Sequence, residues 1–385
     1  MATDYSIYIH IPFCVCKCRY CDFYSVPQSS DSFFLLDRYI DALAKEWKFY
    51  EDNGILEGVS VDTIYIGGGT PSMLCADMWS KLDDALFSRI DKTMIREWSV
   101  ECNPDSFTIE KARMYADSGV TRLTFGVQSL NPKELSICGR AHSTDQAMRA
   151  LSDSRLFELF NSIAVDIIYA LPGQTVNSLD NTLSCILSIS HISHLSAYEL
   201  TIAEGTPFGR HEKNLKLPDD DTVTEMYELI GKRCAERGID QYEISNYARP
   251  GFESIHNKAY WSHKPYIGLG ASAHSYIHPN RWSNIADIER YVSLISANKA
   301  ARDFEEILDP LELSREMIFL GLRNIDGIDE NKYIDSTGLI FCTDNRQKYL
   351  QKFIDSGLLK KTLSKWIPTS KGMLFADMMA RELAE

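Results

Sequence analysis

The chain has 385 residues and a formal net charge of −14, from 40 Lys and Arg against 54 Asp and Glu. This balance argues against a nucleic-acid partner, which requires a basic face, and no apolar run is long enough to cross a membrane. With 44% hydrophobic and 24% charged residues, the composition is that of a globular protein. The amino terminus is neither a secretory signal nor an Arg-rich transit peptide, so we expect a cytoplasmic protein whose thiols stay reduced.

Strand and helix patterns alternate through the first 200 residues. Strand patterns cover residues 5–11, 61–66, 98–102, 122–129, 162–169 and 194–201. Helical spacing covers residues 31–50, 73–90 and 108–118. Strands that alternate with helices favour a parallel sheet, and six successive units predict an α/β fold built as a closed or a partial (β/α)6 barrel.

The regular alternation fades after residue 201. Residues 219–238 are predicted to be helical and residues 242–247 are strand-like. Helical patterns at residues 311–322 and 345–356, with a last helix after Gly372, predict a small, mostly helical module. We therefore divide the chain into residues 1–302, a barrel with an extension, and residues 303–385, a carboxyl-terminal module. The module carries no recognisable chemistry, and a docking, lid or stabilising role would fit it equally.

Four of the ten cysteines lie within eight positions, directly after the first predicted strand. Cys14, Cys18 and Cys21 form a C-x3-C-x2-C set, which can hold three irons of a [4Fe–4S] cluster and leave the fourth iron open to a chelating ligand. A structural zinc site would normally have a second Cys or His pair at a regular distance, and the following cysteines are isolated. Cys16 is a spare ligand, a metal-transfer group or an inert filler.

Unusual residues follow the predicted strands, at the end of a (β/α) barrel where chemistry takes place. The three glycines at 67–69 indicate either a flexible turn or the close approach of a ligand. Glu101 is either a solvated carboxylate or an acceptor for ribose hydroxyls, and Arg140 either pairs with a surface acid or clamps a carboxylate ligand. Asp166 lies in an apolar strand, so we expect it to have a partner or a ligand.

Four of the nine histidines lie close together among many aromatic residues: His256, His263, His274 and His278. Such walls would suit a flat apolar macrocycle with a metal centre and a histidine as axial ligand. The alternative is a packed aromatic core with hydrogen-bonded histidines. The residues by themselves leave both interpretations open.

Nine motifs run in order through nearly the whole chain: HIPFC-x3-C-x-YCDF, GGGTPS, ECNP, GVQS, GRAH, DIIYALPGQT, YEISNYARPG, HNKAYW and GLGASAHS. The set resembles that of the radical S-adenosylmethionine heme chaperones of the HemW type, within the oxygen-independent coproporphyrinogen III oxidase-like family. The resemblance implies that Cys14, Cys18 and Cys21 ligate a [4Fe–4S] cluster. It places these residues around S-adenosylmethionine: Tyr8, Tyr20, Gly68, Gly69, Thr70, Glu101, Gln128, Arg140 and Asp166.

Two features resemble the chaperones more than the oxidases. The oxidase pattern has a fourth cysteine two residues after the third, where this chain has Phe23, and HNKAYW matches the chaperone signature HNxxYW, whose histidine, here His256, is implicated in heme binding. The resemblance thus implies a protein that binds heme and hands it to acceptor apoproteins, with membrane-bound respiratory proteins as candidate acceptors, and that lacks oxidase activity. The alternative is an oxidase that decarboxylates coproporphyrinogen III to protoporphyrinogen IX.

Overall fold

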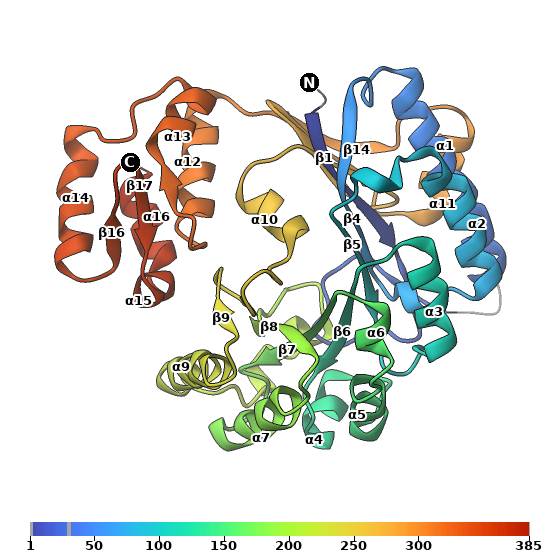
Figure 1. Cartoon of the computed structure of the whole chain (residues 1–385), viewed down its shortest axis with the longest axis horizontal. Coiled ribbons are helices and arrows are strands. Elements are labelled where there is room, and N and C mark those ends of the chain that lie inside the picture. Colours follow the sequence, from blue (N-terminus) through green and yellow to red (C-terminus); the bar gives the residue numbers. More distant parts are fainter. Residues whose placement is uncertain (1–2, 29–31, 385) are drawn as a thin grey trace.

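A row of parallel strands forms the centre of the computed structural model, which describes residues 3–28 and 32–384 (Figure 1). The strands are β1 (Thr3–Ile11), β4 (Val59–Gly68), β5 (Glu97–Cys102), β6 (Arg122–Gln128), β7 (Ser162–Tyr169) and β8 (Ile192–Glu199). They lie side by side in chain order, and each is parallel to the next. The predicted α/β class and partial (β/α)6 barrel are confirmed.

Further strands extend both edges of this sheet. On the β1 side follow β11 (Tyr266–Leu269), β12 (His274–Ile277), β13 (Asn280–Asn284) and β14 (Arg302–Ile307), and on the β8 side β10 (Asn246–Ala248) and β9 (Asp240–Gln241). The single strand predicted at residues 242–247 is wrong. The amide of Tyr242 donates to the carbonyl of Asn246, so this segment turns back and pairs β9 antiparallel with β10.

Helices cover the outer face of the sheet (Figure 1). They are α1 (Ser32–Asp52), α2 (Ala76–Leu86), α3 (Ile109–Ser118), α4 (Pro132–Cys138), α5 (Thr144–Leu151), α6 (Leu156–Leu159), α7 (Val176–Leu187) and α9 (Asp220–Ala235). The predicted first residue of α1, Asp31, lies outside the described residues. Helix α2 begins later than predicted because residues Pro71–Met73 form a separate 3-10 turn. None of the described helices is long and apolar enough to span a bilayer.

The two faces of the parallel strands differ in polarity. Ile7 and Ile64 are fully buried in the apolar core on the side of the helices. Their neighbours Ser6 and Thr63 point to the opposite, inner face, where the Thr63 hydroxyl donates to Ser6 Oγ at 2.9 Å. A barrel closed by helices alone would need apolar side chains on both faces. The polar inner face is accordingly covered by a short helix and by a cavity.

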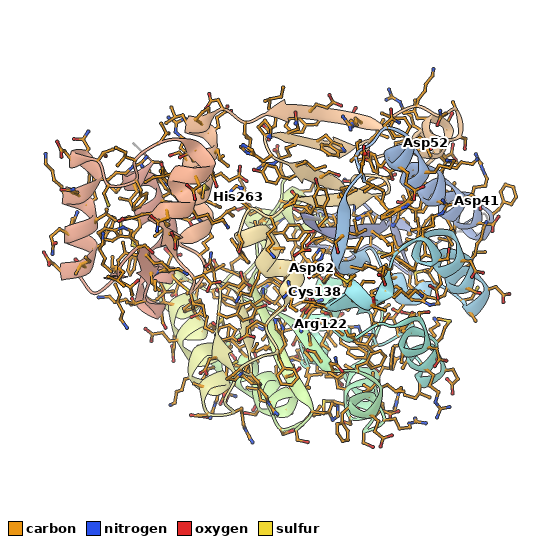
Figure 2. All side chains as sticks on the ribbon, turned by 45° about the horizontal axis from the view of Figure 1, so that its top comes forward. Asp41, Asp52, Asp62, Arg122, Cys138 and His263 are labelled. Atoms are coloured by element: carbon orange, nitrogen blue, oxygen red, sulfur yellow. The ribbon has the colours of Figure 1, made fainter. Side chains whose placement is uncertain are left out.

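Helix α10 (Ile255–Trp261) is the element that packs against the inner face (Figure 1). The buried Glu97 carboxylate, at the start of β5, accepts hydrogen bonds from Ser254 Oγ and from the amides of Ile255 and His256, at 3.0 to 3.2 Å. Arg122, labelled in Figure 2, lies 3.5 Å from the same carboxylate. A negative charge at a helix amino terminus is favourable, so Glu97 fixes the entry of α10 into the barrel.

The carboxyl-terminal module has a hydrophobic core that is separate from that of the barrel. Its helices are α12 (Pro310–Gly321), α13 (Glu330–Thr337), α14 (Asp344–Asp355), α15 (Ser370–Leu374) and α16 (Ala376–Leu383). The sequence did not indicate its small antiparallel sheet of β15 (Ile328–Asp329), β17 (Lys365–Pro368) and β16 (Leu359–Lys361). Strand β14 spans the predicted boundary between residues 302 and 303, and this division stays a prediction.

Candidate functional site

The cysteine loop is pinned at both ends by a short parallel pair, β2 (Phe13–Cys14) and β3 (Val26–Pro27). The amide of Gln28 donates to the carbonyl of Cys14 at 2.8 Å, so the two ends of the loop are held together. Cys14, Cys16, Cys18 and Cys21 all line one cavity of about 260 Å³ at the carboxyl ends of the parallel strands. The structure thus brings the four thiols to the end of the barrel where the sequence predicts the chemistry.

The middle of the loop docks on the end of α4. The amide of Arg19 donates to the carbonyl of Cys138 at 2.9 Å, and the Cys16 thiol donates to the carbonyl of Gly139 at 3.4 Å. Figure 2 shows Cys138 in the interior of the molecule. The Cys16 thiol is therefore bonded to a backbone carbonyl of the segment after α4.

Most of the residues predicted to surround S-adenosylmethionine line this same cavity. They are Tyr20, Gly68, Gly69, Thr70, Glu101, Gln128, Arg140 and Asp166. The lining also includes Asn103, which follows a predicted strand, and Thr124 and Tyr198, which the sequence did not single out. Position at a strand end was the signal that could have identified Tyr198. The roles of the predicted residues toward a ligand stay predictions.

Two half-buried carboxylates face the cavity. Glu101 accepts from the Tyr65 hydroxyl at 2.8 Å and from the Gly68 amide at 3.1 Å, and burial raises its pKa to about 7. Burial also raises the pKa of Asp166 to about 6, and its Oδ1 has no hydrogen-bond partner among the described residues. An unpaired buried acceptor is costly, so Asp166 favours a ligand that carries hydrogen-bond donors or positive charge.

Arg140 links the cysteine loop to two strands. Its Nη1 donates to Cys18 Sγ at 3.4 Å, and its Nη2 donates to Asn103 Oδ1 at 2.8 Å and to the carbonyl of Gly126 at 2.5 Å. Arg140 therefore does not form the alternative ion pair with a surface acid in the part of the chain that the structure describes. Only Nε lacks a hydrogen-bond partner among the described residues, so the guanidinium first of all orients the loop.

The glycines of the GGGTPS motif allow β4 to approach β1 and the cysteine loop closely. The amides of Gly69 and Thr70 donate to the carbonyls of Ile11 and Phe13 at 2.9 and 2.8 Å. Gly68 has φ +106°, and a Cβ there would lie 2.4 Å from the ring of His10. One interpretation of the three glycines was that a ligand approaches their backbone closely. Part of this close approach is made instead by the backbone of Ile11 and Phe13.

Replacing Gly68 by Ala is expected to destabilise the protein by about 2–5 kcal/mol. The left-handed φ costs about 1–2 kcal/mol and forced overpacking another 1–3 kcal/mol. Gly173→Ala is the matched control, because Gly173 has φ +76° but open space around its Cβ position. Urea denaturation of the two variants checks this. Equal losses in the free energy of unfolding would show that the contact with His10 carries no cost.

Tyr8 and His256 lie outside the lining of the cavity. Tyr8 donates to His10 Nδ1 at 2.9 Å and stacks on Tyr65 with 6.2 Å between the ring centroids. The ring of His256 is buried next to the ring of Tyr65. Its Nδ1 lies 2.8 Å from Thr63 Oγ1, and its Nε2 lies 2.9 Å from the Tyr260 hydroxyl. Burial lowers the pKa of His256 to about 3, which makes it a neutral, internally bonded imidazole.

Comparisons with known proteins agree with this architecture. Residues 8–186 match the family model described as the radical SAM superfamily, and residues 308–375 match the HemN C-terminal domain. A solved structure entitled "Coproporphyrinogen III oxidase (HemN) from Escherichia coli is a Radical SAM enzyme" has a TM-score of 0.84 at 21% identity. It covers 100% of this chain and 90% of that chain, and this similarity shows the fold.

Two curated relatives are similar over most of their length. The heme chaperone HemW of Lactococcus lactis subsp. lactis is 36% identical over 331 residues, 85% of this chain and 84% of the relative. The heme chaperone HemW of Bacillus subtilis is 36% identical over 340 residues, 86% of this chain and 87% of the relative. With the cysteine loop, the partial barrel and the carboxyl-terminal module in place, the chain belongs to the HemW family of radical SAM proteins.

Proposed function

We propose that the chain is a heme chaperone that binds a [4Fe–4S] cluster and S-adenosylmethionine, carries heme as its cargo and transfers it to acceptor apoproteins. The observation that carries the proposal is the convergence of three thiols and eight predicted S-adenosylmethionine positions on one cavity, in a member of the HemW family. The cytoplasmic location and the membrane-bound respiratory acceptors belong to the same proposal. The reducing cytoplasm would keep the cluster thiols available.

The donor set of the loop fits a cluster. Among residues 3–28 and 32–384, no three His, Cys, Asp or Glu side chains are grouped around a position for a single metal ion. A [4Fe–4S] cluster is held by thiolates that each bind a different iron. Cys14, Cys18 and Cys21 face one cavity from a pinned loop, and Arg140 holds Cys18 in place. These residues would hold the cluster, with one iron left for S-adenosylmethionine.

The acidic lining fits S-adenosylmethionine, which carries an ammonium group, a sulfonium and ribose hydroxyls. Asp166 Oδ1 is an unused acceptor in the cavity wall, and it would take up a donor of this ligand. Glu101 is oriented by Tyr65 and Gly68 and would accept from the ribose. When bound, a reduced cluster would supply an electron that is able to cleave the sulfonium. The chain itself positions the ligand and excludes competing groups.

Anaerobic reconstitution followed by hemin titration and an assay for coproporphyrinogen III decarboxylation tests the proposal. We expect about one hemin per chain and no decarboxylation with S-adenosylmethionine and reductant present. Decarboxylation that requires both reagents would make the protein an oxidase, the alternative function. Absence of saturable hemin binding would also contradict the chaperone role.

A further inference from the structure

A second pocket opens beside the cysteine loop. We call it the aromatic pocket, and it has a volume of about 440 Å³. Its lining consists of Tyr8, His10, Asp22, Phe23, Tyr24, Tyr260, Tyr266, Ser272 and His274. Asp22 and Phe23 also line the cavity that holds the cluster thiols, so the two spaces share a wall. Five aromatic side chains and two imidazoles form a lining suited to a flat, apolar ring system with a metal centre.

Two histidines near this pocket have no free lone pair. His10 Nε2 lies 2.8 Å from the carbonyl of Tyr24 and must donate to it, so Nδ1 accepts from the Tyr8 hydroxyl. Thr63 donates to Ser6, so His256 Nδ1 donates to Thr63 and Nε2 accepts from the Tyr260 hydroxyl. A neutral imidazole binds a metal through its lone pair. Neither ring can bind iron unless these bonds break.

His274 is different. It lies at the start of β12, its side chain is exposed, and it lines the aromatic pocket. Its ring makes no hydrogen bond or ion pair among the described residues. His263 does not line the pocket: its ring packs on Tyr276, on the side that faces the carboxyl-terminal module (Figure 2). His274 is therefore the one imidazole of the described pocket lining that a metal can reach without rearrangement.

The aromatic residues give the pocket a defined shape. Tyr260 and Tyr266 meet edge to face, with their ring centroids 4.6 Å apart. Phe23 is 61% exposed and lies at the wall shared with the cluster cavity. An exposed phenylalanine next to half-buried tyrosines is apolar surface that a bound macrocycle would cover.

We propose that the aromatic pocket is the cargo site for heme, that His274 is the axial ligand of its iron, and that His256 is a positioning residue. This inference rests on the proposed function, since it assumes that the protein binds heme. His256 and Tyr260 lie four residues apart on α10, and the Tyr260 hydroxyl donates a hydrogen bond to His256 Nε2. His256 thus acts on heme through Tyr260, whose ring forms part of the pocket wall.

The test is hemin titration of the full-length, cluster-loaded protein, with the Soret band of bound heme as readout. His274→Ala is expected to weaken hemin binding about tenfold or more and to shift the Soret maximum, and added imidazole is expected to restore it. His278→Ala is the matched control: His278 is also exposed and near in sequence but does not line the pocket, so its binding and spectrum should match the wild type.

His256→Gln and Tyr260→Phe are expected to lower hemin affinity by a smaller factor and to leave the Soret maximum unchanged. A shifted maximum in His256→Gln together with a normal one in His274→Ala would make His256 the ligand and overturn the inference. The chaperone proposal would survive that result, because heme would still bind. Failure of the wild-type protein to bind hemin would overturn both.

Discussion

Cys18→Ala protein that is reconstituted anaerobically is expected to lose the visible absorbance of the iron–sulfur cluster, whereas Cys16→Ala protein keeps it. Cys18 is one of three thiols proposed to hold the cluster, and Arg140 orients it by a hydrogen bond at 3.4 Å. Cys16 lies in the same loop, but its thiol bonds to the carbonyl of Gly139. Bound iron per chain should fall from about four to near zero in the first variant only.

Cys16→Ala is the matched control for Cys18→Ala, because each substitution removes one thiol from the same loop. A general effect of loop damage would reduce cluster loading in both variants alike. If Cys16→Ala lost the cluster while Cys18→Ala retained it, the ligand set would have to be redrawn with Cys16 in it. Circular dichroism of both apoproteins would show whether either variant is misfolded.

Asp166→Asn is expected to stabilise the ligand-free protein and at the same time to abolish S-adenosylmethionine binding. Burial raises the pKa of Asp166 from 3.8 to about 6, so ionising it in the folded protein costs up to about 3 kcal/mol. The Ser196 side chain hydrogen-bonds to Asp166, and asparagine removes the ionisation cost while it keeps a carbonyl oxygen for Ser196. Calorimetric unfolding and titration with S-adenosylmethionine measure the two effects on one sample.

The sign of the pH dependence follows from the raised pKa. Above about pH 6 the Asp166 carboxylate is ionised in both states and its full desolvation cost is present. Below the unfolded value of 3.8 it is protonated in both, so the advantage of Asp166→Asn should shrink as the pH falls from 6 to 4. An advantage that does not change with pH would contradict this account.

Asp62 supplies a control of opposite sign. Hydrogen bonds from Arg96 hold the pKa of Asp62 below its usual value, and Figure 2 labels this residue. A lowered pKa contributes stability above the unfolded pKa, and that stability is lost as the pH falls through the folded value. Asp62→Asn should therefore destabilise the protein at neutral pH, while Asp166→Asn stabilises it.

Local patterns were sufficient to predict the six parallel strands and the edge where the site lies. Each strand is continuous and apolar on its outer face, and Gly68, Glu101 and Gln128 mark the strand ends. The short strands β11 to β13 and the sheet of the carboxyl-terminal module were missed, because segments of two to five residues show no measurable period.

The surroundings of His256 could not be predicted from the sequence for a different reason. Its partner Thr63 lies 193 residues away in the chain, and the two meet only because α10 packs on the inner face of the sheet. The motif HNKAYW singled out the segment that forms α10, but it indicated neither the helix nor the direction in which its histidine points. Likewise, His274 became distinct from the other histidines of its segment only when hydrogen-bond partners and pocket lining were known.

The pairing of β1 with β11 has a consequence for how the protein matures on the ribosome. Ile9 pairs with Leu269, so the strand that leads into the cysteine loop has β4 on one side but lacks its neighbour on the other side until 260 more residues have been translated. At the usual rate of synthesis this takes roughly 13 to 50 s. During that interval the cysteine loop has been synthesised, but the sheet that supports it still lacks β11. Insertion of a metal cluster is therefore expected to follow translation, and a nascent chain stalled before β11 should not retain iron.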